Sequence, residues 1–252
     1  MSILIENVTK RYGKKVAVDG LTLSVKPGEL YAFLGPNGAG KTTTIKVATG
    51  LLRPTSGTVS VCGHDVHGDG VVARKVISYV PDQPFLYDKL TGREFLVFVG
   101  GMYGMDPDAC ARRIERISKR FDTLEYIDEL AEGYSHGMKQ RIVLSAAILH
   151  DPRVLVIDEP MVGLDPRSGR LVKNVLREMV EDGVTVFMST HTLSIAEEVA
   201  DRVGIIYHGR LVGEGTVDEL RSRGHTSGRL EDVFLTLTSG PAEPDTPDSP
   251  PV

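Results

Sequence analysis

The first part of the chain alternates short apolar runs with turn residues. The runs Ile3–Ile5, Val16–Val18 and Leu21–Val25 have strand length, and the turn sequence Lys26-Pro27-Gly28-Glu29 closes this region. Leu30–Leu34 follows as an uninterrupted apolar run, which is typical of a strand buried on both faces. The pattern predicts a small N-terminal antiparallel sheet beside a buried strand.

The next segments continue the alternation of helix and strand. Thr44–Leu51 has helical spacing with Gly50 near its end, which predicts a short helix. Thr58–Cys62 and Val76–Val80 are typical of strands, and the second ends at Pro81.

A different pattern begins near Thr91 and lasts to about His150. Apolar residues recur there at spacings of three and four, as one expected helical face illustrates. That face consists of Cys110, Ile114, Ile117, Phe121 and Leu124. We interpret residues 85–150 as an inserted helical subdomain.

Parallel-sheet character then returns. Val154–Ile157 is apolar throughout and Val184–Met188 is apolar except at Thr185, and the residues from Leu171 to Val180 place one apolar face on a helix stopped by Gly183. The segment Val203–Gly215 resembles a hairpin.

Two features close the chain. Thr216 and Glu219 fit a capping box at the start of a helix. Residues 239–252 contain five prolines and three acidic residues with almost no apolar content, which predicts a disordered Pro-rich acidic tail. Residues 1–238 are therefore the expected folded domain.

Composition narrows the class of protein. The 252 residues are 41% hydrophobic, enough for a core, and the net charge of −5 argues against a nucleic-acid partner. Cys62 and Cys110 are the two cysteines, which fits a reducing cytoplasm. Since no apolar run approaches the ~20 residues that span a bilayer, we expect any membrane role to go through a partner.

One glycine-rich stretch carries the clearest chemistry. It fits G-x-x-x-x-G-K-[ST] between the strand Leu30–Leu34 and the helix that follows, which is the setting of a phosphate-binding P-loop. Lys41 would reach the β- and γ-phosphates, and the Thr42 hydroxyl would bind Mg²⁺. The fold class expected is α/β, a P-loop NTPase with a mostly parallel core sheet. The motif is Gly35-Pro36-Asn37-Gly38-Ala39-Gly40-Lys41-Thr42-Thr43.

A P-loop needs an acidic partner, and Val154–Ile157 ends in one. Asp158 would hold Mg²⁺ through water, and Glu159 could orient and deprotonate a water for attack on the γ-phosphate. The two residues thus supply a metal site and a general base.

Further segments indicate a family. They are Tyr134-Ser135-His136-Gly137-Met138-Lys139-Gln140-Arg141, Gly163-Leu164-Asp165, Thr190-His191 and Tyr12. In order and spacing, over essentially Ile3 to Leu237, the chain resembles the ATP-binding cassette (ABC) proteins. Residues 134–141 resemble the family's signature, residues 163–165 its D-loop, His191 its switch histidine, and Tyr12 its adenine-stacking aromatic.

The resemblance implies that two copies dock head to tail around two ATP molecules. Ser135 fits an N-cap, so its helix could present its N-terminus to an anion. In the implied dimer one subunit contributes P-loop and acidic residues, and the other contributes Ser135 and Gly137. The first set is Lys41, Thr42, Asp158, Glu159 and His191, and Asp165 of the D-loop is counted among the nucleotide-binding residues.

The chain departs from the common family pattern at two places. His136 and Met138 replace a glycine and a glutamine of the signature, which puts the rate of hydrolysis in question more than binding. Asp82 stands where the family usually has a glutamine after a proline. Either Asp82 ligates Mg²⁺ or Gln83 takes that role through a one-residue shift, and we favour Asp82.

The function implied is an ATPase that drives an exporter. Residues 230–235 and the signature segment resemble the ABC-2 exporter-type ATPases, which pair with separate permeases, and Phe85–Tyr87 with Phe95–Val99 lie where the family contacts those partners. The protein is then expected in the cytoplasm, peripheral on the inner face of the membrane. Its dimer partner is itself or a second cassette subunit. The alternatives are a soluble ABC ATPase of translation or repair and a slowly hydrolysing regulator.

Overall fold

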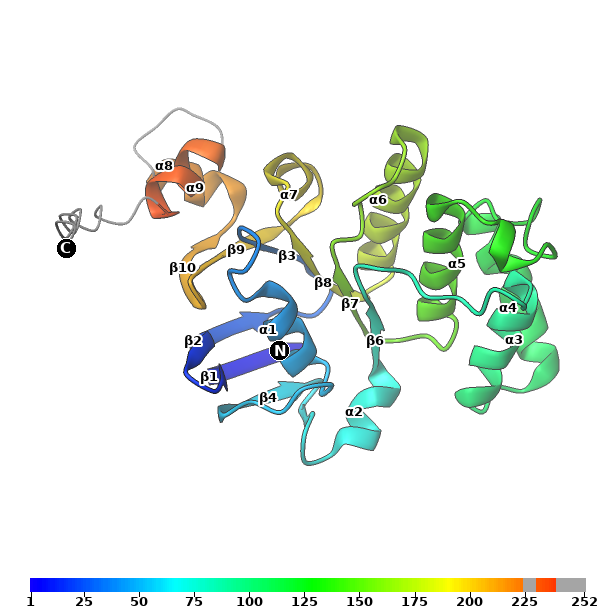
Figure 1. Cartoon of the computed structure of the whole chain (residues 1–252), viewed down its shortest axis with the longest axis horizontal. Coiled ribbons are helices and arrows are strands. Elements are labelled where there is room, and N and C mark those ends of the chain that lie inside the picture. Colours follow the sequence, from blue (N-terminus) through cyan, green and yellow to red (C-terminus); the bar gives the residue numbers. More distant parts are fainter. Residues whose placement is uncertain (224–229, 239–252) are drawn as a thin grey trace, which may run out of the picture.

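Strands of the chain form two sheets, with helices packed against both (Figure 1). The computed structural model describes residues 1–223 and 230–238. The predicted disordered tail, residues 239–252, lies outside the described residues.

The larger sheet has six strands in the order β10-β9-β3-β8-β7-β6. Its neighbours run parallel except the β9–β10 hairpin, so the mostly parallel core sheet is confirmed. The strands are β3 (Leu30–Leu34), β6 (Ile77–Val80), β7 (Val154–Asp158), β8 (Thr185–Thr190), β9 (Arg202–Tyr207) and β10 (Arg210–Gly215).

Strand β3 lies at the centre of the packing because both of its faces are buried. Leu30, Ala32 and Leu34 point into a core formed with the helices on one side. Tyr31 and Phe33 point into a second core beneath the smaller sheet. Burial on both sides explains why the strand is apolar at every position.

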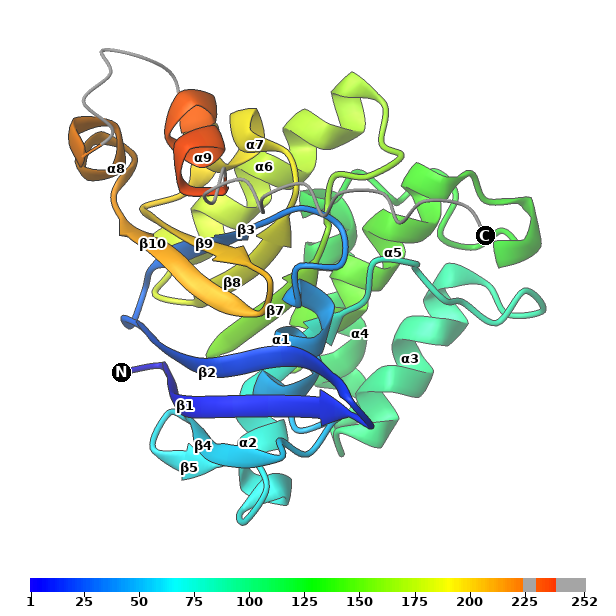
Figure 2. The same ribbon diagram turned by 60° about the vertical axis from the view of Figure 1, so that its left-hand side comes forward.

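The smaller sheet is antiparallel, with the order β2-β1-β4-β5 (Figure 2). Its strands are β1 (Ile3–Tyr12), β2 (Lys15–Val25), β4 (Ser56–Val61) and β5 (His64–Asp65). An antiparallel sheet was predicted here from N-terminal residues alone, and that was incomplete, because β4 and β5 follow the P-loop helix and return to pair with β1. The two predicted runs Val16–Val18 and Leu21–Val25 are one strand.

Most of the helices begin and end where the sequence signals predict. Helix α6 ends before Gly183, whose φ of 89° suits a glycine, and the capping box predicted at Thr216 and Glu219 is present at the start of α8. The helices are α1 (Lys41–Ala48), α2 (Gly70–Val76), α3 (Gly92–Met102), α4 (Pro107–Arg120), α5 (His136–Ile148), α6 (Pro166–Glu181), α7 (Leu193–Val199), α8 (Val217–Arg223) and α9 (Leu230–Thr238), with a short 3-10 turn at Ala131–Gly133.

The predicted helical subdomain consists of α3, α4 and α5, which lie at the opposite end of the molecule from α8 and α9 (Figure 1). One predicted face extended too far. Helix α4 stops at Arg120 because Asp122 takes a positive φ of 54° and the Thr123 amide bonds back to the Ser118 carbonyl at 2.9 Å. Leu124 therefore lies beyond the helix and is 40% exposed.

Among the described residues, no helix combines the length and apolar character needed to cross a bilayer.

Candidate functional site

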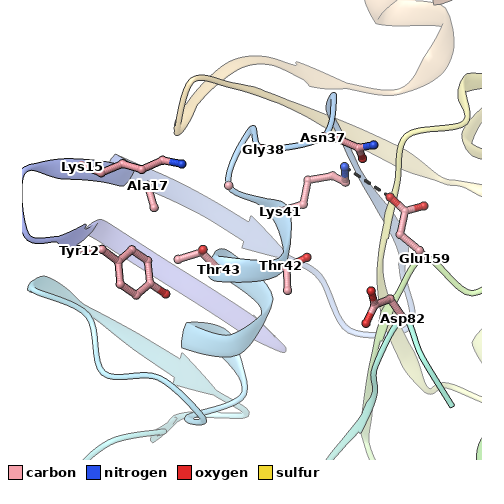
Figure 3. A pocket seen from close by; sticks show the side chains of 11 residues that line it. Tyr12, Lys15, Ala17, Asn37, Gly38, Lys41, Thr42, Thr43, Asp82 and Glu159 are labelled. Carbon is pink, nitrogen blue, oxygen red and sulfur yellow. Dashed lines mark ion pairs between the residues drawn. The ribbon is translucent and has the colours of Figure 1, made fainter. Parts of the chain in front are cut away.

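A cavity of about 490 Å³ lies where the β3–α1 loop faces the ends of β1 and β7 (Figure 3). In the close-up, Tyr12 lies at one end of the cavity and Glu159 at the other. The lining residues are Tyr12, Lys15, Ala17, Asn37, Gly38, Gly40, Lys41, Thr42, Thr43, Asp82 and Glu159.

The loop from Gly35 to Gly40 takes its shape from glycines at points of close backbone contact. A Cβ on Gly40 would lie 2.5 Å from the Ala17 carbonyl oxygen, and the φ of Gly40 is 112°. A Cβ on Gly35 would lie 2.5 Å from the Ile206 carbonyl oxygen. Gly40 also precedes α1 without a side-chain cap, so the first N–H groups of that helix keep their capacity to bind an anion.

Lys41 is folded back over this loop and is only 6% exposed. Its Nζ donates hydrogen bonds to the carbonyl oxygens of Gly35, at 2.8 Å, and Pro36, at 3.3 Å. The same Nζ lies 3.4 Å from Oε1 of Glu159. The lysine therefore lies at the predicted phosphate-binding loop, with the Glu159 carboxylate as its counter-ion.

Glu159 is held from the backbone as well as through its side chain. Its amide donates to the Ser189 carbonyl at 3.2 Å and to the Ser189 hydroxyl at 3.1 Å. Its Oε1 is 3.0 Å from Nδ1 of His191, and its Oε2 accepts the His191 amide at 3.3 Å. Of the three predicted catalytic residues, Glu159 thus contacts both of the others, Lys41 and His191.

Asp158 is completely buried at the end of β7. Its Oδ1 accepts a hydrogen bond from the Ser189 hydroxyl, and within the described residues its Oδ2 has no hydrogen-bond partner. An unpaired buried carboxylate oxygen is costly, so Oδ2 would gain from a hydrogen bond donated by a metal-bound water. Asp158 does not line the cavity, so it would reach Mg²⁺ through such a water.

Thr42 and Asp82 do line the cavity, so a hydroxyl and a carboxylate reach the space expected for Mg²⁺. Oδ1 of Asp82 accepts the Gln83 amide at 3.0 Å, and Gln83 is not among the lining residues. Burial raises the pKa of neighbouring Tyr79 to about 12, with further contributions from the Asp158 and Asp82 carboxylates. This donor set fits a hard cation, and its geometry favours Asp82 over Gln83.

Tyr12 projects from the end of β1 and is 49% exposed, with Nζ of Lys10 lying over its ring at 5.3 Å from the centroid, so the exposed part of the ring could meet a base. Lys15, at the start of β2, also lines the cavity, and the sequence reasoning missed it. Ser189 was also missed, although it contacts both Asp158 and Glu159. The sequence could have indicated Ser189, because it is the first residue of the polar Ser189-Thr190-His191 end of a buried parallel strand.

The signature residues lie elsewhere. Ser135 caps α5, as predicted, by accepting the Met138 amide at 3.3 Å, and it does not line the cavity. Asp165 caps α6 and accepts from the amides of Arg167, at 2.9 Å, and Ser168, at 3.1 Å. The Ser168 hydroxyl, at 2.6 Å, is the main cause that lowers the pKa of Asp165 below its usual value.

Gly137 joins these two caps. A Cβ placed on it would lie 3.3 Å from the Ser168 hydroxyl and 3.7 Å from Asp165 Oδ2. Ser135, Gly137 and Asp165 therefore form one group, separate from the cavity that holds the P-loop, and the structure does not bring the two groups together within one chain.

Comparison with known proteins gives the family. A model described as ABC transporter matches residues 18–162. The chain is 38% identical over 234 residues to the daunorubicin resistance ATP-binding protein DrrA3 of Streptomyces coeruleorubidus, covering 93% of this chain and 73% of that protein. It is 43% identical over 210 residues to the Nod factor export ATP-binding protein I of Burkholderia orbicola (strain AU 1054), covering 83% and 69%.

Solved structures agree. The ATP-binding subunit of an ABC transporter superposes with a TM-score of 0.87 at 30% identity, covering 94% of this chain and 99% of that chain. A dimeric bacterial ABC transporter cassette gives a TM-score of 0.78 at 25% identity, covering 85% and 98%. These matches favour a transport ATPase over the translation, repair and regulator alternatives. The chain belongs to the ABC transporter family, as an ATP-binding and ATP-hydrolysing subunit of the exporter type.

Proposed function

We propose that two copies of this chain close head to tail around two MgATP molecules and, by hydrolysing them, drive export through separate membrane-spanning subunits. The observation that carries the proposal is the separation of the two groups of site residues. Lys41 and Glu159 line one cavity and His191 contacts Glu159, whereas Ser135 and Gly137 do not line that cavity. A related cassette is dimeric, which supports completion of each site by a second subunit.

Binding of ATP would begin at the loop and at the N-terminus of α1. The amides there receive the phosphates, and Lys41 turns from Glu159 toward the β- and γ-phosphates. Thr42, Asp82 and, through water, Asp158 would hold Mg²⁺, which supplies positive charge that offsets the charge developing on the phosphates. Tyr12 stacks on the adenine at the far end of the cavity.

Glu159 then acts as the general base. Once Lys41 has moved to the phosphate, the carboxylate keeps its contacts with the His191 side chain and amide, which hold it in place. From there it orients a water toward the γ-phosphorus and accepts the proton as the water's oxygen attacks. ADP and inorganic phosphate leave, and the dimer loses the ligand that joined it.

An exposed aromatic cluster on the helical subdomain is the proposed contact with the membrane subunits. Tyr87 packs edge-on against Phe85, with ring centroids 5.4 Å apart, and against Phe98, at 6.1 Å. Phe85 is 68% exposed, and Met102 at the end of α3 is 73% exposed. Contiguous exposed apolar side chains of this kind mark interaction sites. Contact there would place the protein on the inner face of the membrane.

The test is the association state of the Glu159→Gln protein, measured by light scattering with and without MgATP. The substitution preserves shape and removes the base, so we expect a monomer that becomes a dimer only with MgATP. Glu178→Gln is the matched control, since this exposed α6 carboxylate pairs with Arg120 far from the cavity, and it should hydrolyse ATP as the unaltered protein does. A Glu159→Gln protein that binds ATP and stays monomeric would overturn the homodimer.

A further inference from the structure

The start of α5 is attached to the loop that follows Glu159. Nε2 of His136 lies 3.1 Å from the Val162 carbonyl oxygen. One turn further on, the buried Gln140 points its Nε2 at the Pro160 carbonyl oxygen, at 3.5 Å. The helix that carries the signature thus reaches the loop from residue 159 to 165 at two carbonyls, those of Pro160 and Val162.

That loop has little other support of its own. Its internal backbone hydrogen bonds run from the Val162 amide to Glu159, at 3.2 Å, and from the Leu164 amide to Met161, at a long 3.4 Å. It begins at Glu159 and contains Gly163, both with positive φ, of 51° and 74°. A segment with two such residues and two weak internal bonds depends on its neighbours for its position.

His136 supplies part of that support through packing and through the hydrogen bond that its Nε2–H donates to the Val162 carbonyl. A Cβ on Gly163 would lie 3.1 Å from Cδ2 of His136, so the imidazole rests against the Gly163 backbone. Because the Val162 carbonyl only accepts hydrogen bonds, Nε2 must carry the proton. Both the neutral Nε2–H form and the cation meet that requirement, whereas the glycine of the common family pattern does not.

We propose that His136 is a positioning residue that ties the signature turn to the loop beginning at Glu159, and so sets the geometry of hydrolysis without affecting the binding of ATP. The inference rests on the proposed dimer, in which Ser135 and Gly137 meet the partner's nucleotide. In that dimer the arrival of the signature turn at one ATP moves the backbone next to the base that serves the other. His136 therefore links the two sites, and the reaction is cooperative in ATP because of it.

Three substitutions separate the contributions of the ring and the proton. His136→Phe keeps a ring over Gly163 and has no donor, His136→Gln keeps a donor without the ring, and His136→Gly removes both. Loss of one hydrogen bond should lower kcat about five- to tenfold in the Phe and Gly proteins. KM for ATP should stay within about twofold, the Hill coefficient should fall toward one, and Gln should restore most of kcat.

The matched control is His64→Phe, a substitution in β5 of the antiparallel sheet, which should leave kcat and the Hill coefficient unchanged. Wild-type kcat and cooperativity in His136→Phe would overturn the inference, as would an equal loss in Phe and Gln. The Glu159→Gln/His136→Phe double variant separates this inference from the dimer, because it should still dimerise with MgATP. If Glu159→Gln alone fails to dimerise, the proposed function is wrong. If both dimerise and His136→Phe keeps normal kinetics, only the role of His136 is wrong.

Discussion

The nucleotide cavity and the signature turn, residues 135–138, differ in what their predicted site residues contact. At the cavity, Glu159 contacts both Lys41 and His191, so the contacts of the predicted catalytic residues lie within one chain. At the signature turn, the Ser135 hydroxyl caps a helix by accepting the Met138 amide, and His136 contacts the Val162 carbonyl. Predicted site residues that contact one another within one chain reveal their role in those contacts, whereas residues proposed to meet the nucleotide of a partner subunit reveal only what supports them.

The strongest test of this difference uses two glycine substitutions. In Gly40→Ala the new Cβ would lie 2.5 Å from the Ala17 carbonyl oxygen on a backbone of φ 112°, so the loop must shift and lose its phosphate donors. We expect ATP affinity and phosphate release to fall about 100-fold or more, measured by calorimetry on the monomer and by a phosphate assay.

Gly137→Ala is the counterpart at the signature turn. Its Cβ would meet the Ser168 hydroxyl at 3.3 Å, a contact that a small side-chain movement relieves. ATP binding to the single chain should be normal while hydrolysis is lost, because the partner's phosphate approaches this position. Equal weakening of single-chain ATP binding by both substitutions would abolish the distinction between the two regions.

A second comparison lies within the cavity and concerns the metal. Asp82 lines the cavity and Gln83 does not, so Asp82→Ala should lower Mg²⁺-dependent ATPase activity about 10- to 100-fold, and Gln83→Ala should leave it near normal. Titrating Mg²⁺ in steady-state assays of both proteins measures this. The opposite ranking would assign the role to Gln83.

A smaller effect is expected from the cap at the signature turn. Ser135→Ala leaves the Met138 amide without its 3.3 Å partner and should lower the free energy of unfolding by about 1 kcal/mol, measured by urea denaturation. ATP affinity of the monomer should not change. A loss of monomer affinity would mean that the signature turn acts on its own chain's cavity.

The smallest expected effect is a pH dependence of stability at His150, just after the C-terminal end of α5. His150 stacks on Tyr103 at 3.7 Å with ring planes 5° apart. Burial lowers the pKa of His150 below its ordinary 6.5; to lesser degrees the Ile77 backbone raises it, Arg113 lowers it and Asp151 raises it. The unfolded chain therefore binds this proton more readily than the native one, and the protein loses stability as the pH falls below about 6.5.

His150→Phe keeps the stack and removes that proton. Since solvent screens a partly covered ring, we expect its advantage over the unaltered protein to be nil at pH 7 and less than about 1 kcal/mol at pH 6. Thermal unfolding of both proteins across this range provides the measurement. Parallel pH curves for the two proteins would contradict the assignment.

Local signals in the sequence predicted much of this structure. The Thr216–Glu219 box, the Ser135 cap and the glycine after α6 each depend on a few neighbouring residues, and the structure has all three. The buried parallel strands also followed from uninterrupted apolar runs.

Features that depend on distant residues could not be predicted in the same way. No local pattern states that β4 pairs with β1, because that partner is chosen by the packing of α1 between the sheets. The end of α4 depends on the positive φ of Asp122, which spacing alone did not reveal. The contact between His136 and Val162 joins the start of α5 to a loop residue 26 positions away, so the sequence presented His136 only as a departure from a pattern.

The contact between Lys41 and Glu159 has a consequence for how the cavity fills and empties. The buried lysine has a carboxylate of its own chain at 3.4 Å, so departure of ADP need not leave an isolated buried cation. If Lys41 binds the phosphates as proposed, nucleotide entry is an exchange of counter-ions, in which a phosphate competes with a fixed carboxylate for one ammonium group. The affinity for ATP would then report the difference between these two anions, with the carboxylate of Glu159 as a competitor inside the site.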